Sequence, residues 1–299
     1  MNKGVLAAIS AYFLWGVFPL YWKSMASVPT YEILCHRVIW SILFISILLF
    51  WRKQWNWMLL LKQNYRLLLP FIVSGILIAV NWLTYIWAVN SGYIVETSLG
   101  YFINPLVNVF LGVIVLRERL RIAQWISILI AFSGVLYLTI QYGQFPWISV
   151  ILAFSFGFYG LIRKTSKLGS LEGLSLEMGI LLTPAVITVI FLDAQGTSSF
   201  IQGSTITRIL LTSTGLITTI PLLLFAYGAR NVSLTTLGLL QYLAPTMQLL
   251  IGVHIYNEEF PQVRLVGFSL VWISFLVYSL EGVIYSRKRF REYQSEKKR

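Results

Sequence analysis

The composition describes a chain that is too apolar to fold in water. It has 299 residues, of which 57% are hydrophobic and 11% charged, with a net charge of +12 and a mean hydropathy of +0.75. A soluble domain carries about 25% charged residues, so we expect an integral membrane protein. The basic residues fall in short clusters between apolar stretches, which argues against nucleic-acid binding.

The residues needed for most enzyme and metal chemistry are scarce. The chain has one cysteine, Cys35, and two histidines, which argues against a disulfide framework or a metal site. It contains neither a Gly-rich phosphate loop nor a pair of carboxylates placed for hydrolysis. We therefore expect no cofactor, no metal and no enzymatic activity.

Ten apolar runs follow one another along the chain. A bilayer core of about 30 Å requires about 20 apolar residues in a helix, and backbone polar groups in lipid must be satisfied within the segment. The expected spans are 4–22, 33–51, 67–88, 98–116, 121–140, 147–162, 172–192, 207–228, 233–256 and 264–285. The first run is longer than the core of a cleaved signal peptide, so we expect it to persist as a span.

The distribution of Lys and Arg predicts the orientation of these spans, because basic residues concentrate on the cytoplasmic side. A cytoplasmic N-terminus places 19 of the 23 basic residues inside and four outside, namely Lys23, Arg37, Arg208 and Arg264. We therefore expect both termini in the cytoplasm. The basic tail, residues 286–299, is most simply a topology anchor, and binding to lipid or to a partner is the alternative.

Spans one and three carry aromatic and amide side chains at mid-depth. Trp15 on span one, with Tyr12 beside it, could stack on a planar substrate or could simply pack against other helices. Asn81 and Tyr85 on span three are four residues apart and therefore share one helix face. Trp15, Asn81 and Tyr85 are candidate cavity residues.

Four ionisable residues in or near the spans are candidates for gating, because a charge inside the bilayer is costly and needs a partner. His36 and Arg37 lie about one turn into span two from the outer face, and Glu96 precedes span four on that side. Glu96 is the expected counter-charge of Arg37. This pair could close the outer side, or Arg37 could contact the substrate. Glu177 lies equally deep in span seven from the inner face, too far from His36 to pair.

One stretch of the sequence occurs twice. The segment NPLVNVFLGVIVLRERL, residues 104–120, returns 140 residues later as APTMQLLIGVHIYNEEF, residues 244–260. The matched positions include Pro105 with Pro245, Asn108 with Gln248, Gly112 with Gly252, and Glu118 with Glu258. A second pair, FLWGVFPLYWKS at 13–24 and FSFGFYGLIRKT at 154–165, has an offset of 141. Two echoes at nearly one offset argue against chance similarity between apolar helices.

The repeat predicts an inverted architecture. Five spans separate the copies, and because five is odd, the copies must lie upside down relative to each other. Inverted repeats are typical of secondary transporters. We therefore expect an all-α membrane protein of ten transmembrane helices in two inverted five-helix repeats, 1–140 and 147–285, followed by the basic tail.

These features resemble the EamA type of the drug/metabolite transporter superfamily. The resemblance rests on ten spans, the Trp-Gly and Lys of span one, and the Pro, Gly and Glu that close spans four and nine. The stretches YEILCHRVIWS at 31–41 and GYFINPLVNV at 100–109 are similar to its RarD branch. The resemblance covers essentially the whole chain and implies a permease. Members are described as permeases, and RarD as a chloramphenicol-sensitivity protein.

Spans four and nine present matched polar faces near the midplane, where inverted repeats place substrate sites. The candidates on span four, spaced by three and four residues on one helix face, are Tyr101, Asn104 and Asn108. Those on span nine are Gln241, Tyr242 and Gln248. A proline in each span removes a backbone donor, which is expected to free carbonyls near Tyr101 and Gln241. The amides either line a substrate cavity or join helices by hydrogen bonds.

The sequence therefore predicts a secondary transporter of a small organic metabolite or drug in the cytoplasmic membrane. The expected partners are a small-molecule substrate and membrane lipid. A membrane-embedded scaffold or enzyme without transport activity is the alternative, and a lipid carrier would be a variant of transport. Small multidrug pumps of the same superfamily carry a membrane-embedded Glu in span one, and this chain has none there. Proton antiport and facilitated diffusion both stay open.

Overall fold

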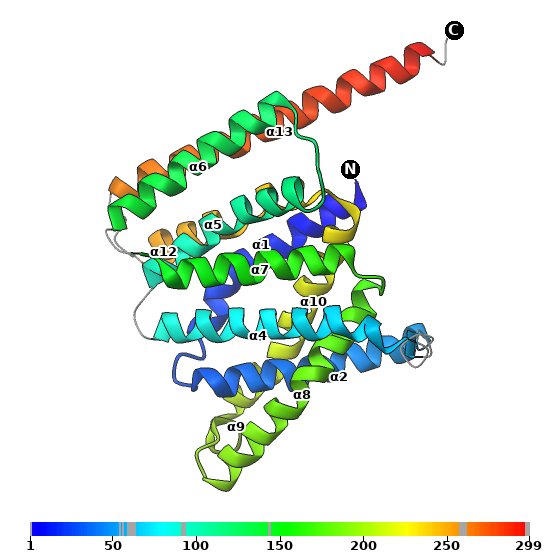
Figure 1. Cartoon of the computed structure of the whole chain (residues 1–299). Coiled ribbons are helices and arrows are strands. Elements are labelled where there is room, and N and C mark those ends of the chain that lie inside the picture. The colour runs from blue at the N-terminus through cyan, green and yellow to red at the C-terminus, as the bar shows by residue number, and fades with distance from the viewer. Residues whose placement is uncertain are drawn as a thin grey trace.

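The computed structural model describes residues 2–53, 55, 57–58, 64–90, 94–142, 145–256 and 262–296. Within these ranges every regular element is a helix (Figure 1). The first half contains α1 (Lys3–Lys23), α2 (Thr30–Arg52), η1 (Tyr65–Leu68), α4 (Leu69–Asn90), α5 (Ile94–Ile114) and α6 (Ile122–Tyr142). The second half contains α7 (Trp147–Thr165), α8 (Ser170–Ala194), α9 (Ser199–Gln202), α10 (Thr205–Asn231), α11 (Leu234–Leu240), α12 (Leu243–Ile255) and α13 (Gln262–Glu296).

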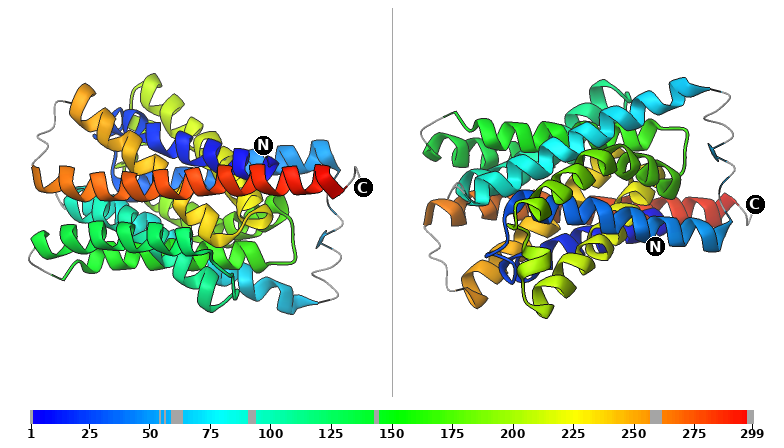
Figure 2. Two further views of the ribbon diagram at one scale, coloured as in Figure 1. Left: turned by 90° about the horizontal axis from the view of Figure 1, so that it is seen from above. Right: turned by 90° about the horizontal axis from the view of Figure 1, so that it is seen from below.

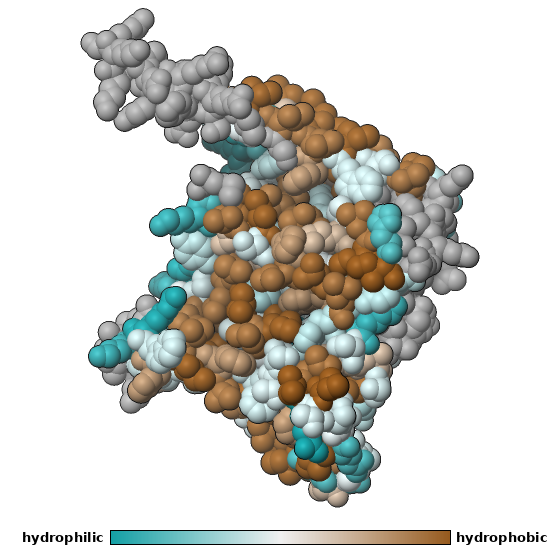
Figure 3. Space-filling model, turned by 180° about the vertical axis from the view of Figure 1, so that it is seen from behind, coloured by the Kyte–Doolittle hydropathy of each residue, from teal (hydrophilic) through white to brown (hydrophobic). Residues whose placement is uncertain are grey.

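Eight helices of the described chain are long and apolar enough to cross a membrane. They correspond to the expected spans one to three, five to eight and ten. Figure 3 shows hydrophobic residues in a broad band across one face, with polar residues toward its margins. The chain is thus a multi-pass membrane protein. The fourth expected span is α5, whose apolar part, Gly100–Ile114, is shorter.

The ninth expected span, 233–256, is not one helix. Leu240 ends α11 and Leu243 begins α12, with Gln241 and Tyr242 in a turn between them. Pro245 has no N–H to offer the carbonyl of Gln241, and this carbonyl accepts a hydrogen bond from the Ala244 N–H at 3.1 Å instead. The expectation of a freed carbonyl at Gln241 was therefore wrong, because the backbone tightens and satisfies it.

Helix contacts follow the same order in both halves. The helix α5 packs on α7 as α12 packs on α1, and α4 packs on α7 as α10 packs on α1. Two further pairs join matched helices directly, α2 with α8 and α6 with α13. Figures 1 and 2 show α6 and α13 side by side at one edge of the bundle, with α13 extending past the other helices. The start of α1 and the end of α13 lie at the same end of the bundle (Figure 2).

Two glycines allow close helix contacts at matched positions of the two halves. A Cβ on Gly16 of α1 would lie 2.7 Å from Cβ of Met247 on α12. A Cβ on Gly157 of α7 would lie 2.6 Å from Cγ1 of Val107 on α5. Real Cβ atoms do not approach other atoms so closely, so both contacts require glycine. The two glycines are 141 residues apart and their partners 140 apart, which matches the sequence repeat.

The hydrophobic core has two main parts. The larger cluster lies among α1, α2, α4, α7, α8 and α10, where Tyr159 and Phe225 are fully buried. A smaller cluster joins Phe102 of α5 and Tyr242 to α6 and α13, through Ala131 and Val271. Tyr12, Trp82 and Ala244 of the larger cluster also line the cavity described below.

Candidate functional site

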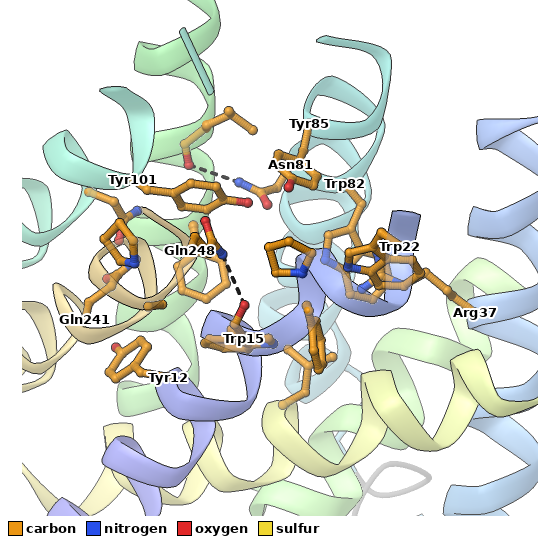
Figure 4. A pocket seen from close by; sticks show the side chains of 18 residues that line it. Tyr12, Trp15, Trp22, Arg37, Asn81, Trp82, Tyr85, Tyr101, Gln241 and Gln248 are labelled. Carbon is orange, nitrogen blue, oxygen red and sulfur yellow. Dashed lines mark hydrogen bonds between the residues drawn. The ribbon is translucent and has the colours of Figure 1, made fainter. Parts of the chain in front are cut away.

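A cavity of about 90 Å³ opens between the helices of the two halves (Figure 4). This is several times the space that one water molecule needs. Its lining comes from α1, α2, α4, α5, α7, α10, α12 and the turn before α12: Tyr12, Trp15, Phe18, Pro19, Trp22, Arg37, Asn81, Trp82, Tyr85, Tyr101, Asn104, Leu152, Phe156, Leu222, Gln241, Ala244, Pro245 and Gln248. The lining residues of α1 and α2 place the cavity mainly in the half of the bundle away from the termini.

Aromatic rings close the cavity toward the end of the bundle that holds both termini. Tyr12, Tyr159 and Phe225, which we call the aromatic floor, are each 0% exposed. The Phe225 ring centroid lies 6.2 Å from that of Tyr12 and 5.9 Å from that of Tyr159. Trp15 packs above this floor, 5.6 Å from Phe225. Such ring pairs stack at preferred separations and leave little room for water.

Arg37 is the one charged side chain among the lining residues that the structure describes. Its Nε donates to Oγ1 of Thr218 at 3.0 Å. The guanidinium carbon lies 4.1 Å from the Trp82 ring centroid and 4.9 Å from that of Trp22. These cation–π contacts stabilise the charge without a carboxylate. Figure 4 places Arg37 at one end of the cavity, away from Gln241 and Tyr12.

Three amides line the cavity with part of their hydrogen-bonding capacity in use. Asn81 donates to the Leu152 carbonyl and to Ser155 Oγ, both at 3.0 Å. Gln248 donates to the Trp15 carbonyl at 3.1 Å, and Gln241 accepts from Asn108 at 3.0 Å. No hydrogen bond to a described residue uses the second polar atom of any of these three amide groups. Each therefore has a free donor or acceptor for a solute.

Two of the predicted cavity residues lie behind the wall instead. Asn108 is 0% exposed and donates to Asn104 at 3.2 Å as well as to Gln241. Tyr242 is 2% exposed and donates to the Phe102 carbonyl at 3.4 Å. The turn at Gln241 and Tyr242 has no counterpart in the continuous helix α5, and the expected mirror positions differ in exposure. The other predicted residues, Trp15, Asn81, Tyr85, Tyr101, Asn104, Gln241 and Gln248, all line the cavity.

The predicted gating residues are dispersed. His36 lies outside the lining, 4.0 Å from Glu32 and stacked on Phe200. Glu177 is fully buried beside Arg163, with 3.6 Å between Oε1 and Nη1. The side chain of Glu96 lies outside the described part of the chain, so its pairing with Arg37 stays a prediction.

Several residues that shape the site escaped sequence reasoning. Trp22 and Phe156 line the cavity. Trp22 lies near a span end, where an aromatic residue is equally an interface anchor, and Phe156 lies in mid-span, where it is equally ordinary helix packing. Arg163 directly follows the expected span 147–162 and counts among the inner basic residues, whereas the structure buries it in the last turn of α7. Its pairing with Glu177 joins two helices, so no spacing within α7 predicts it.

Long apolar helices packed around a cavity of aromatic and amide side chains define a membrane protein of the transporter class. The model of the EamA-like transporter family matches residues 2–140. Protein RarD of Streptomyces exfoliatus is 44% identical over 287 residues, covering 96% of this chain and 91% of that protein. Protein RarD of Escherichia coli (strain K12) is 41% identical over 288 residues, covering 96% and 97%. The chain belongs to the EamA-like transporter family, in its RarD branch.

A further relative and one solved structure are also similar to this chain. The uncharacterized transporter YojE of Bacillus subtilis (strain 168) is 43% identical over 290 residues, covering 96% of each chain. One protein crystal structure, only 16% identical, superposes with a TM-score of 0.69 over 93% of this chain and 98% of that chain. The second likeness concerns the fold alone.

Proposed function

We propose that the protein is a secondary transporter that carries a small organic solute across the cytoplasmic membrane, with both termini in the cytoplasm. The observation that carries the proposal is the cavity between matched helices of the two halves, closed at one end by the aromatic floor. A solute would enter the cavity from the outer side in this conformation and would leave after the floor opens.

The helix contacts support an inverted ten-helix repeat as the basis of this motion. Gly16 against Met247 and Gly157 against Val107 are equivalent contacts at matched positions of the sequence repeat. If the two halves exchange conformations, the contacts that now close the inner side would re-form on the outer side. Rocking of inverted repeats around a fixed midplane site is the general mechanism of such transporters.

An additional contact holds the inner side closed. Glu118, which follows α5, accepts hydrogen bonds from the backbone N–H groups of Leu234 and Thr235 at 2.7 and 3.1 Å. It also accepts from Oγ1 of Thr235 at 2.7 Å. A carboxylate is favourable at a helix N-terminus, so Glu118 ties the end of α5 to the start of α11. The repeat predicts that Glu258, outside the described residues, makes the matching contact at the outer side in the alternative conformation.

Thiol labelling tests whether the cavity opens to one side. The buried Cys35 is first replaced by Ser, and single cysteines are placed at Tyr101, which lines the cavity, and at Ser127, which is buried on α6. A membrane-impermeant reagent added to intact cells should modify the Tyr101→Cys variant and leave the Ser127→Cys variant unmodified. Equal protection of both positions would contradict an outward-open cavity.

Metabolite profiling tests transport itself. For at least one organic solute, the ratio of its concentrations inside and outside the cells should change when the protein is deleted. Overproduction of the protein should change this ratio in the opposite direction, relative to the parent cells. Uptake of that solute into proteoliposomes should then require the protein. A scaffold without transport activity would change no solute in this comparison.

A further inference from the structure

We infer that the cavity binds a planar organic anion, with its carboxylate on Arg37 and its ring among the aromatic side chains. The inference rests on the proposed transport function and adds the class of substrate to it. Three observations carry it: the partners of Arg37, the aromatic lining, and the amides at the opposite end.

The surroundings of Arg37 leave its terminal nitrogens for a ligand. Thr218 occupies Nε, and the rings of Trp22 and Trp82 lie over the guanidinium carbon. Neither terminal nitrogen donates a hydrogen bond to a residue that the structure describes. The two terminal groups form the fork that matches a carboxylate with two parallel hydrogen bonds. Among the residues that the structure describes, no carboxylate pairs with this buried cation, so an anionic ligand can bind there.

The walls suit a flat, apolar ring. Eight lining residues are aromatic, namely Tyr12, Trp15, Phe18, Trp22, Trp82, Tyr85, Tyr101 and Phe156. Aromatic rings attract one another in stacked and edge-to-face arrangements beyond their burial of area. Tyr85 and Tyr101 form one such pair, with 5.6 Å between their centroids. A planar solute can replace or extend these contacts at little conformational cost.

The far end offers polar groups without charge. Around Tyr101 in Figure 4 lie Asn81, Gln241 and Gln248, each with one free amide atom. These groups can bind a hydroxyl, amide or ring nitrogen of the solute. No acidic side chain belongs to the lining that the structure describes, so an organic cation would meet Arg37 without any opposing carboxylate. The charge arrangement thus selects an anion over a cation.

Binding to the purified full-length protein tests the charge selection without a known substrate. The probes are indole-3-acetate and benzoate, each compared with its neutral amide, and tryptamine as the planar cation. Calorimetric titration should show at least one carboxylate binding about tenfold or more tightly than its amide, since hydrogen bonds to a charged group are worth about 1.5–3 kcal/mol. Tryptamine should bind more weakly than the carboxylate. If neither carboxylate exceeds its amide, or if tryptamine binds most tightly, the inference is overturned.

Three variants test whether Arg37 causes the tighter binding of the carboxylate. Arg37→Gln should remove the advantage of the carboxylate while the amide binds as before, and Arg37→Lys should restore part of it, because Lys keeps the charge but lacks the fork. Arg208→Gln removes an exposed arginine that donates to the Phe200 and Ile201 carbonyls. It should leave both affinities unchanged. A carboxylate advantage that survives in Arg37→Gln would overturn the assignment of Arg37.

The inference and the proposed function can fail separately. Glu96 could permanently pair with Arg37. In that case the parent protein should bind carboxylate and amide equally, and the Glu96→Gln variant should gain carboxylate affinity. This result would overturn an open anion site. A cavity that admits the thiol reagent but binds no carboxylate selectively would leave transport standing and remove the anion. A cavity closed to the reagent on both sides would remove the transport proposal first.

Discussion

Arg163 on α7 and Glu177 on α8 form an ion pair in which neither side chain is exposed. Ser74 donates to Glu177 at 2.6 Å, and Tyr159 donates to it at 3.3 Å. Arg163 in turn donates to the Ser170 carbonyl at 2.8 Å. Because Tyr159 belongs to the aromatic floor, this pair connects α8 to the closed end of the cavity.

Neutralising Glu177 should destabilise the protein strongly. Glu177→Gln keeps the shape of the side chain but leaves the Arg163 guanidinium buried without a counter-charge, which costs about 3–5 kcal/mol in other proteins. Thermal unfolding in detergent should show a much larger loss than for Asp193→Asn, which removes an exposed carboxylate from the same helix. Adding Arg163→Met to Glu177→Gln should recover part of the loss. If Glu177→Gln alone is as stable as the parent protein, the ion pair contributes nothing to stability.

Asn108 and Gln248 are matched in the sequence repeat but should respond differently to replacement by Leu. Asn108 joins Asn104 and Gln241 behind the wall of the cavity, so Asn108→Leu should lower the free energy of unfolding by about 0.6–2 kcal/mol, as for other hydrogen bonds between membrane helices. Gln248 lines the cavity, so Gln248→Leu should weaken solute binding with a smaller loss of stability. The same thermal and binding assays applied to both variants would reject this distinction if their effects were reversed.

At the scale of helices, the apolar runs were predictable and the interruption of the ninth was not. Hydropathy is averaged over a window of residues, and residues 233–256 are predominantly apolar. The break depends instead on a missing backbone donor at Pro245 and on the burial of Tyr242 against Phe102 of another helix. The polar face of α5 was predictable, because Tyr101, Asn104 and Asn108 are spaced by three and four residues. The contribution of Trp82 and Phe156 to one cavity required the tertiary contacts.

Gly16 should allow the close approach of α1 to α12, and Gly157 should allow that of α7 to α5. An added methyl group would press on Met247 Cβ, which moves only with its helix, or on Val107 Cγ1, whose χ1 rotation is restricted in a helix. Overpacking of this kind costs about 1–3 kcal/mol, more than the gain in helix propensity of about 1 kcal/mol. Gly16→Ala and Gly157→Ala should therefore both lower the unfolding temperature.

Gly179 provides the control for this prediction. A Cβ there would meet nothing within 4 Å, so Gly179→Ala should be neutral or stabilising. Equal effects at all three glycines would show that loss of glycine itself, rather than the contact, determines stability.

For the whole molecule, the inverted arrangement makes a prediction about sidedness. The exposed Arg119 lies between α5 and α6 and should face the cytoplasm, whereas the exposed Gln195, directly after α8, should face outward. In a Cys35→Ser background, an impermeant maleimide added to intact cells should label Gln195→Cys and should label Arg119→Cys only after the cells are opened. Labelling of both from outside would exclude the predicted topology.

The helix α13 continues for 35 residues without a break. At about 1.5 Å per residue it is about 50 Å long, whereas a bilayer core is about 30 Å thick. Its last turns therefore extend beyond the membrane into water, as a rigid rod that continues the membrane segment packed on α6. Any tilt of that segment during transport would swing the free end through a larger arc, so that a dye on the rod would report the motion from outside the membrane.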